Sequence, residues 1–239
     1  MPDYLVMFQK LAGTEENIRF MNVYKGVPIS YYGRAVESGA NSVRFHVHAN
    51  QILCMREEKL TYLYSVSVAK VVRASLLGID LLNETVLLTG FEPINHPVGN
   101  RSFVRVEPKD LMEVLIENEE LAAQEVALKA FLIDISLHGA AVFLNVSLAV
   151  SANLSRGERV KLSFTLPDEQ GIGRNIRLAG EVRNIVQVSN LRGGVRIGVQ
   201  THPDKYTEQC LSRYIAQRQN EILKEIRQKV EQEKRLSTV

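Results

Sequence analysis

The sequence has little of what marks a nucleic-acid binder or a membrane protein. Its 29 Lys and Arg against 27 Asp and Glu give a formal net charge of only +2, without any run of five basic residues. Proteins that bind long nucleic acids by neutralising phosphates usually carry a much larger basic excess. The most apolar window, GAAVFLNVSLAV at residues 139–150, is too short to span a bilayer. We therefore expect neither DNA binding nor membrane insertion.

Cysteine is also scarce, and its placement excludes the usual metal motifs. Cys54 and Cys210 are isolated, without C-x-x-C or Cys/His ligand spacing. This usage fits a reducing compartment and leaves a disulfide between them open. The opening stretch, MPDYLVMFQK, has no basic region followed by a long apolar run, as a signal peptide would. The sequence predicts a cytoplasmic protein.

Catalytic motifs are missing as well. There is no G-x-S-x-G, no H-E-x-x-H, no P-loop and no G-x-G-x-x-G after a strand. His46 and His48 would share one face of a strand, but no third metal ligand lies near them in the sequence. We predict that the protein is not an enzyme and carries neither a metal nor a cofactor.

Two β-rich regions and a helix make up the predicted fold. From about residue 20 to 95, short segments such as NSVRFHVHA, TYLYSVSVAKVVRASLL and ETVLLTGFEPI indicate strands, with YYGRAVESGAN read as a turn. The Pro, Gly and Asn of NHPVGN then mark a boundary. Six further strands are predicted in LMEVLIE, EVALKAFLIDIS, GAAVFLNV, ERVKLSFTLP, RNIRLAGEVRNIVQV and GGVRIGVQTH. The strand pattern predicts a mainly β fold: a small antiparallel β domain over residues 1–95, and a closed barrel or sandwich over residues 96–204.

The last segment, residues 205–239, changes to a helical period. Its apolar residues fall on one narrow stripe, formed by Leu211, Ile215, Ile222, Ile226 and Val230. Pro203 and Asp204 supply a helix start. Such a stripe fits a helix that docks on a barrel, and it also permits a coiled-coil contact in a homodimer.

Two motifs carry chemistry. Arg101 and Arg105 are four positions apart in GNRSFVRVEP, so their guanidinium groups converge in either an extended chain or a helix. Guanidinium binds phosphate bidentately and also matches the O6/N7 edge of guanine. In DISLHG, Asp134 complements the guanine N–H donors, Ser136 can donate to phosphate, and Gly139 lets the backbone come close.

Each motif alone has an ordinary explanation. An R-x-x-x-R pair is usually solvated, and D-x-S-x-x-G often forms a turn between strands. Their combination at the entrance to a β-barrel-like region is much less expected by chance. Together they describe a receptor for a guanine nucleotide that bears phosphates.

Residues 99–205 resemble the PilZ domain, the bacterial receptor for cyclic di-GMP, through NRSFVRVEP, FLIDISLHGAAVFL, LAGEVRNIVQV and GGVRIGVQ. The two-domain layout is similar to that of YcgR-type flagellar-brake proteins. The resemblance implies two antiparallel β-barrel domains: an N-terminal split-barrel-like domain over residues 1–95 and a six-stranded barrel over residues 96–204. The resemblance implies that Arg101, Arg105, Asp134, Ser136 and Gly139 bind the ligand, with the linker motif 99–106 over the mouth of the barrel. Further candidate contacts are Asn100, Ser102, Val104, His138 and Arg183.

Asn100 departs from the pattern, because many relatives carry an arginine there, which influences ligand affinity and stoichiometry. The implied function is that of a cyclic di-GMP effector. Its ligand would order the interdomain linker and re-orient the domains, and so control an unidentified partner protein in motility, biofilm or exopolysaccharide output. The alternative is a ligand-independent adaptor or oligomerisation protein that acts through its C-terminal helix. A split-barrel flavin enzyme is a third reading, for which no residue gives support.

Overall fold

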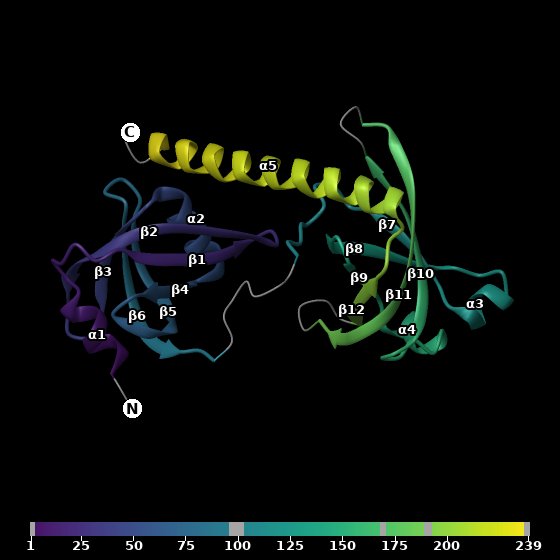
Figure 1. The fold of residues 1–239 in the computed structure, drawn as a ribbon, viewed down its shortest axis with the longest axis horizontal. Helices are drawn as coiled ribbons and strands as arrows, with labels where there is room; N and C mark the ends of the chain where they lie inside the picture. Colours follow the sequence, from purple (N-terminus) through teal and green to yellow (C-terminus); the bar gives the residue numbers. More distant parts are fainter. Residues whose placement is uncertain (1–2, 96–102, 168–170, 189–192, 237–239) are drawn as a thin grey trace. The chain divides into compact units, whose positions relative to one another are not determined.

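Two closed antiparallel barrels of six strands each form the protein, as the sequence predicts (Figure 1). The structure is a computed structural model that describes residues 3–95, 103–167, 171–188 and 193–236. The chain divides into two units: Met1–Ser102 together with Ile222–Val239, and Phe103–Glu221.

The first unit contains the N-terminal barrel, with strand order β1-β2-β3-β6-β5-β4. Its strands are β1 Ile18–Tyr24, β2 Val27–Ser38, β3 Val43–Val47, β4 Leu60–Ser65, β5 Val68–Asp80 and β6 Thr85–Pro93. Phe20 and Phe45 meet edge to face in the core, with ring centroids 5.4 Å apart. Helix α1, Tyr4–Lys10, adds the fully buried Phe8 to this cluster. Alternating apolar residues thus fill this barrel with aromatic side chains.

Two sequence expectations for this barrel are wrong in detail. YYGRAVESGAN is not a turn, because residues up to Ser38 belong to the twelve-residue strand β2. Gly33 serves a close approach instead, since a Cβ there would lie 2.4 Å from the His46 carbonyl oxygen. TYLYSVSVAKVVRASLL is not one segment but the hairpin of β4 and β5. Helix α2, Ala49–Glu58, was not predicted.

The second barrel has strand order β10-β11-β12-β9-β8-β7. Its strands are β7 Glu113–Glu117, β8 Leu128–Ser136, β9 Gly139–Asn145, β10 Arg159–Pro167, β11 Gly173–Gln187 and β12 Gly194–Thr201. All six coincide with the strands expected from the sequence. The short helices α3, Glu119–Ala123, and α4, Val146–Ser151, lie between strands.

Helix α5, Lys205–Leu236, confirms the predicted C-terminal helix. It starts as expected at Asp204, whose Oδ1 accepts a hydrogen bond from the Thr207 backbone N–H at 2.7 Å. Its residues 205–221 belong to the second unit and its residues 222–236 to the first. The whole predicted stripe is buried within the chain: Leu211, Ile215, Ile222, Ile226 and Val230. The stripe therefore docks on the protein itself rather than lying exposed for a coiled coil.

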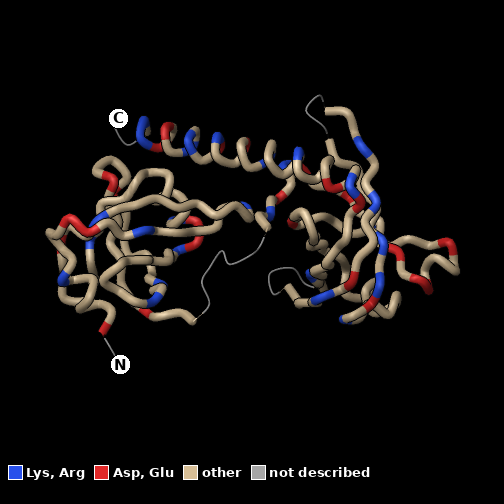
Figure 2. Tube along the Cα trace, viewed as in Figure 1, with Lys and Arg blue, Asp and Glu red and all other residues tan. Residues whose placement is uncertain are grey.

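Charged contacts accompany this docking in the first unit, and α5 carries residues of both charge signs (Figure 2). Glu225 pairs with Lys25 at 2.5 Å, and Glu233 accepts two hydrogen bonds from Arg56, at 2.5 and 2.6 Å. Lys234 donates to Glu84 at 2.6 Å. These contacts fix the register of residues 222–236 on the N-terminal barrel.

The residues that the structure describes contain neither a membrane-spanning helix nor a cluster of metal ligands. None of their helices has both the length and the apolar character needed to cross a bilayer. Nor do they bring together three or more His, Cys, Asp or Glu side chains in a way that could hold a metal ion.

Candidate functional site

A β-bulge places Asp134 on the outside of the second barrel. Strict alternation along β8 would send residue 134 inward, after Leu128, Ala130 and Leu132, which are all buried. The register with β9 shifts between Leu132 and Asp134, which is the mark of a bulge. Ile135 therefore takes the inward position, paired with Ala140, and Asp134 pairs with Ala141 on the outer face.

The segment that carries Arg105 is held against the same strand. Val106 forms an isolated antiparallel bridge with Ile135. The Val106 N–H donates to the Ile135 carbonyl at 2.9 Å, and the Ile135 N–H donates back at 3.0 Å. Val106 is also fully buried, which adds an apolar anchor to the backbone pair. The residue just before it is Arg105, so the bridge sets where this arginine emerges.

Arg105 and Asp134 meet as a result, although 29 positions separate them. Nη1 of Arg105 lies 3.3 Å from Oδ1 of Asp134. The other carboxylate oxygen, Oδ2, accepts from Nη2 of Arg196 on β12. The Asp134 side chain is 8% exposed, against 33% for Arg105 and 42% for Arg196. One nearly buried carboxylate thus holds two partly exposed guanidinium groups.

The turn between β8 and β9 places the other two residues of the second motif. Ser136 ends β8, Gly139 begins β9, and the Ser136 hydroxyl donates to the Gly139 carbonyl at 3.1 Å. A Cβ at position 139 would lie 3.1 Å from the Val199 carbonyl oxygen, which is tight. Glycine therefore allows β12 to pass close to this turn.

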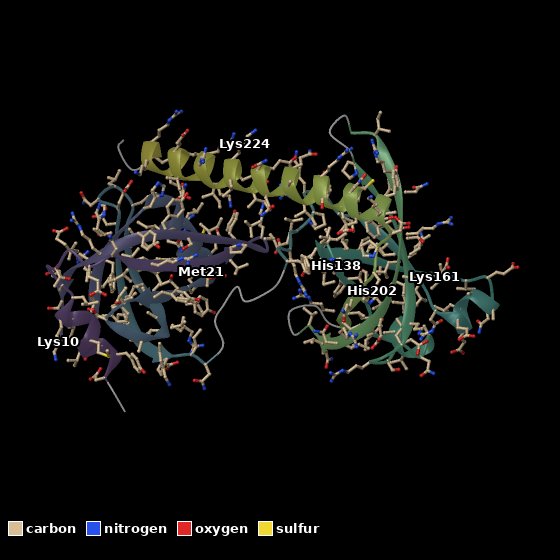
Figure 3. The ribbon with its side chains drawn as sticks, viewed as in Figure 1. Lys10, Met21, His138, Lys161, His202 and Lys224 are labelled. Atoms are coloured by element: carbon tan, nitrogen blue, oxygen red, sulfur yellow. The ribbon has the colours of Figure 1, made fainter. Side chains whose placement is uncertain are left out.

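The remaining described candidates lie around the turn and on β11. The His138 ring, labelled in Figure 3, meets the ring of Phe103 edge to face at 4.5 Å. Val104, between Phe103 and Arg105, is half-buried. Arg183 stands on β11 and donates to Gln200 at 2.7 Å and to Glu181 at 2.6 Å. Aromatic, imidazole and guanidinium groups therefore accompany the Arg105–Asp134 pair in this barrel.

Three predicted contacts lie outside the described residues: Asn100, Arg101 and Ser102. Of the five principal candidates, the structure therefore places Arg105, Asp134, Ser136 and Gly139. It brings Arg105 to Asp134 and Ser136 to Gly139.

Sequence reasoning missed Arg196. Its position in GGVRIGVQ alternates with buried Val195 and Ile197, so the period of two already puts it on the outer face. The alternation does not show which strands pair with one another in the sheet. Arg196 of β12 stands opposite Phe143 on β9, and β9 in turn pairs with β8, which carries the outward Asp134.

Comparison with known protein families finds a match over the part of the chain that holds this site. Residues 99–217 match the family described as the PilZ domain. The match includes both sequence motifs, the whole second barrel and the beginning of α5. No curated protein matches the chain.

Several solved structures are similar at low identity. The Bacillus subtilis inhibitor of motility MotI/DgrA is 18% identical, covers 86% of this chain and 96% of its own, and has a TM-score of 0.45. MrkH of K. pneumonia, solved as a complex with c-di-GMP, is 13% identical, with 94% of each chain covered and a TM-score of 0.42. YcgR of Escherichia coli, also with c-di-GMP, is 13% identical, covers 94% and 92%, and has a TM-score of 0.41.

Proposed function

This chain is a PilZ-domain protein, and on that premise we propose that it is a non-enzymatic receptor for cyclic di-GMP. The observation that carries the proposal is the approach of Arg105 to Asp134 at 3.3 Å, because this pair joins the two motifs of the sequence. Guanidinium and carboxylate together offer donors to phosphate and acceptors to the N–H edge of guanine.

In this proposal Arg105 binds a phosphate and guanine of the ligand, together with Arg101. Asp134 accepts from the guanine N1–H and exocyclic amino group. Ser136 turns its hydroxyl, which can rotate, from the Gly139 carbonyl to a phosphate oxygen. His138 and Phe103 offer ring faces and edges beside the turn for a base to contact.

Titration calorimetry of cyclic di-GMP into the full chain tests the proposal. We expect saturable binding by the wild type and a loss of about 1–3 kcal/mol or more in Arg105→Ala, the scale of a bidentate contact to guanine. Cyclic di-AMP, which has the same phosphates but lacks the guanine donor edge, should bind more weakly. If the wild type releases no heat at tens of micromolar protein and Arg105→Ala behaves identically, the proposal fails.

A matched control separates site effects from charge effects. Arg177 on β11 faces outward opposite Ser163 of β10, and it is exposed. Arg177→Ala removes the same charge from the same barrel as Arg105→Ala does. We expect cyclic di-GMP affinity to be unchanged in Arg177→Ala.

The proposed output is a change in the arrangement of the two units, to which a downstream partner protein responds in motility, biofilm formation or exopolysaccharide synthesis. A ligand can drive such a change only by binding one arrangement more tightly than the other. Small-angle scattering with and without cyclic di-GMP measures it. Identical curves at saturation, with binding verified by calorimetry, would reject the rearrangement and leave the receptor proposal intact.

A further inference from the structure

Arg196 belongs to neither of the two motifs, yet it reaches the same carboxylate as Arg105. Its Nη2 donates to Oδ2 of Asp134, while Arg105 occupies Oδ1. The two arginines come from different parts of the chain, Arg196 from strand β12 and Arg105 from the segment before β7. The carboxylate therefore has one guanidinium on each oxygen.

The strand pattern directs the Arg196 side chain outward and leaves donors for a ligand. Its neighbours Val195 and Ile197 are buried, and across the sheet it stands opposite Phe143 of β9 and Val186 of β11. A guanidinium has five N–H donors. The contact with Asp134 uses one nitrogen, and the side chain is 42% exposed.

The charges of this cluster favour an anion. Arg105, Asp134 and Arg196 together carry two positive charges and one negative charge. The negative charge is the least accessible of the three, at 8% exposure of the Asp134 side chain. What the surface presents is therefore mainly guanidinium, fixed in direction by the carboxylate beneath it.

We propose that Arg196 is a direct ligand contact that binds a phosphate of the cyclic dinucleotide, held in place by Asp134. This inference rests on the proposed receptor function and extends it. A cyclic dinucleotide carries two phosphates, and Arg196 supplies a cation for one of them on the β12 side of Asp134, at the carboxylate oxygen that Arg105 does not contact. Asp134 already has Arg105 as an ionic partner, so Arg196 is not needed merely to neutralise the carboxylate.

The test is a fluorescence or calorimetric titration of cyclic di-GMP into wild type, Arg196→Ala, Arg196→Gln and the control Arg177→Ala. We expect Arg196→Ala and Arg196→Gln to bind about tenfold more weakly or worse, since each loses a charge-assisted contact to phosphate. Their affinity should also depend less on salt concentration than that of the wild type. Thermal melts verify folding, and the glutamine variant carries the test if the alanine variant is poorly folded.

A double-mutant cycle with Asp134→Ala distinguishes direct contact from an effect through the carboxylate. If Arg196 touches phosphate, Arg196→Ala weakens binding further in the Asp134→Ala background. If the second substitution adds nothing there and Arg196→Ala alone keeps the salt dependence of the wild type, Arg196 acts only by positioning Asp134, and the proposal is overturned. Wild-type binding with Arg196→Ala equal to Arg177→Ala also overturns it. Absence of binding by the wild type is a different result, which rejects the receptor function itself.

Discussion

Val106, which lies outside the named strands, exchanges two backbone hydrogen bonds with Ile135 of β8. Each residue stands next to a residue of the site, since Arg105 precedes Val106 and Asp134 precedes Ile135. The bridge therefore sets the relative position of the guanidinium and the carboxylate before any ligand arrives. Its strength should affect both the stability of the second barrel and the affinity for cyclic di-GMP.

Two substitutions at Val106 separate the side chain from the backbone. Val106→Ala removes apolar groups from a fully buried position and should cost about 1–2 kcal/mol of unfolding free energy. Val106→Pro also removes the N–H that donates to Ile135, which should cost about 1–3 kcal/mol more. Urea unfolding measures both. Cyclic di-GMP affinity should fall more in the proline variant, and equal affinities would show that the bridge does not position Arg105.

The C-terminal half of α5 should contribute strongly to the stability of the first unit. Ile226 is 1% exposed there, and Ile226→Ala should cost about 2–5 kcal/mol through lost burial and the cavity left behind. The neighbouring Arg227 is exposed, so Arg227→Ala should stay within about 0.5 kcal/mol. Hydrogen exchange of β1 and α2 reports on this unit. Equal protection in the two variants would mean that residues 222–236 do not stabilise it.

The two cysteines should differ sharply in reactivity. Cys54 is fully buried in α2, and this burial raises the pKa of its thiol to about 12, so the reactive thiolate is absent at neutral pH. Cys210 on α5 is half-buried. A thiol reagent such as DTNB should therefore modify Cys210 in the folded protein and both residues in denaturant. Rapid labelling of folded Cys210→Ser would contradict the burial of Cys54.

Acid should weaken the contact between Lys234 and Glu84. The hydrogen bond from Lys234 is the main reason why the pKa of Glu84 is lowered from 4.5 in the folded protein. A lowered carboxyl pKa stabilises the fold above the unfolded value, and this contribution is lost as the pH falls through the folded value. Unfolding of the first unit between about pH 3 and pH 7 should show this loss in the wild type. Glu84→Gln should flatten it, whereas Glu231→Gln, at an exposed position of α5, the helix that carries Lys234, should not.

The fold was largely predictable because both barrels follow the period of two. The exceptions have local causes. Gly33 looks like a turn residue, but it lies inside β2, and it is glycine because the His46 carbonyl comes too close for a Cβ. Helix α2 lacks an amphipathic pattern, since Asn50 and Gln51 are buried with their apolar neighbours. In both cases the packing of other strands decides the structure, and one segment of sequence does not contain that information.

The candidate site was predictable as far as its motifs reach. Arg105, Asp134, Ser136 and Gly139 could be chosen from residue types and spacing. Arg196 could not, because its contact with Asp134 depends on β12 lying beside β9 and β9 beside β8. Alternation along one strand predicts which face of the sheet a side chain points to. Only the order of the strands in the sheet tells which other side chains it meets there.

The extra residue in β8 implies that the number of residues, as well as their identity, decides which way this site faces. With Ile133 present but no bulge, strict alternation from Leu132 would turn the Asp134 carboxylate toward the apolar interior and Ile135 outward. If Ile133 were deleted instead, Asp134 would follow Leu132 directly and would keep its outward position, with Ile135 still inward. D-x-S-x-x-G is present in every one of these cases. The motif letters alone therefore do not determine whether the barrel presents the carboxylate on its surface.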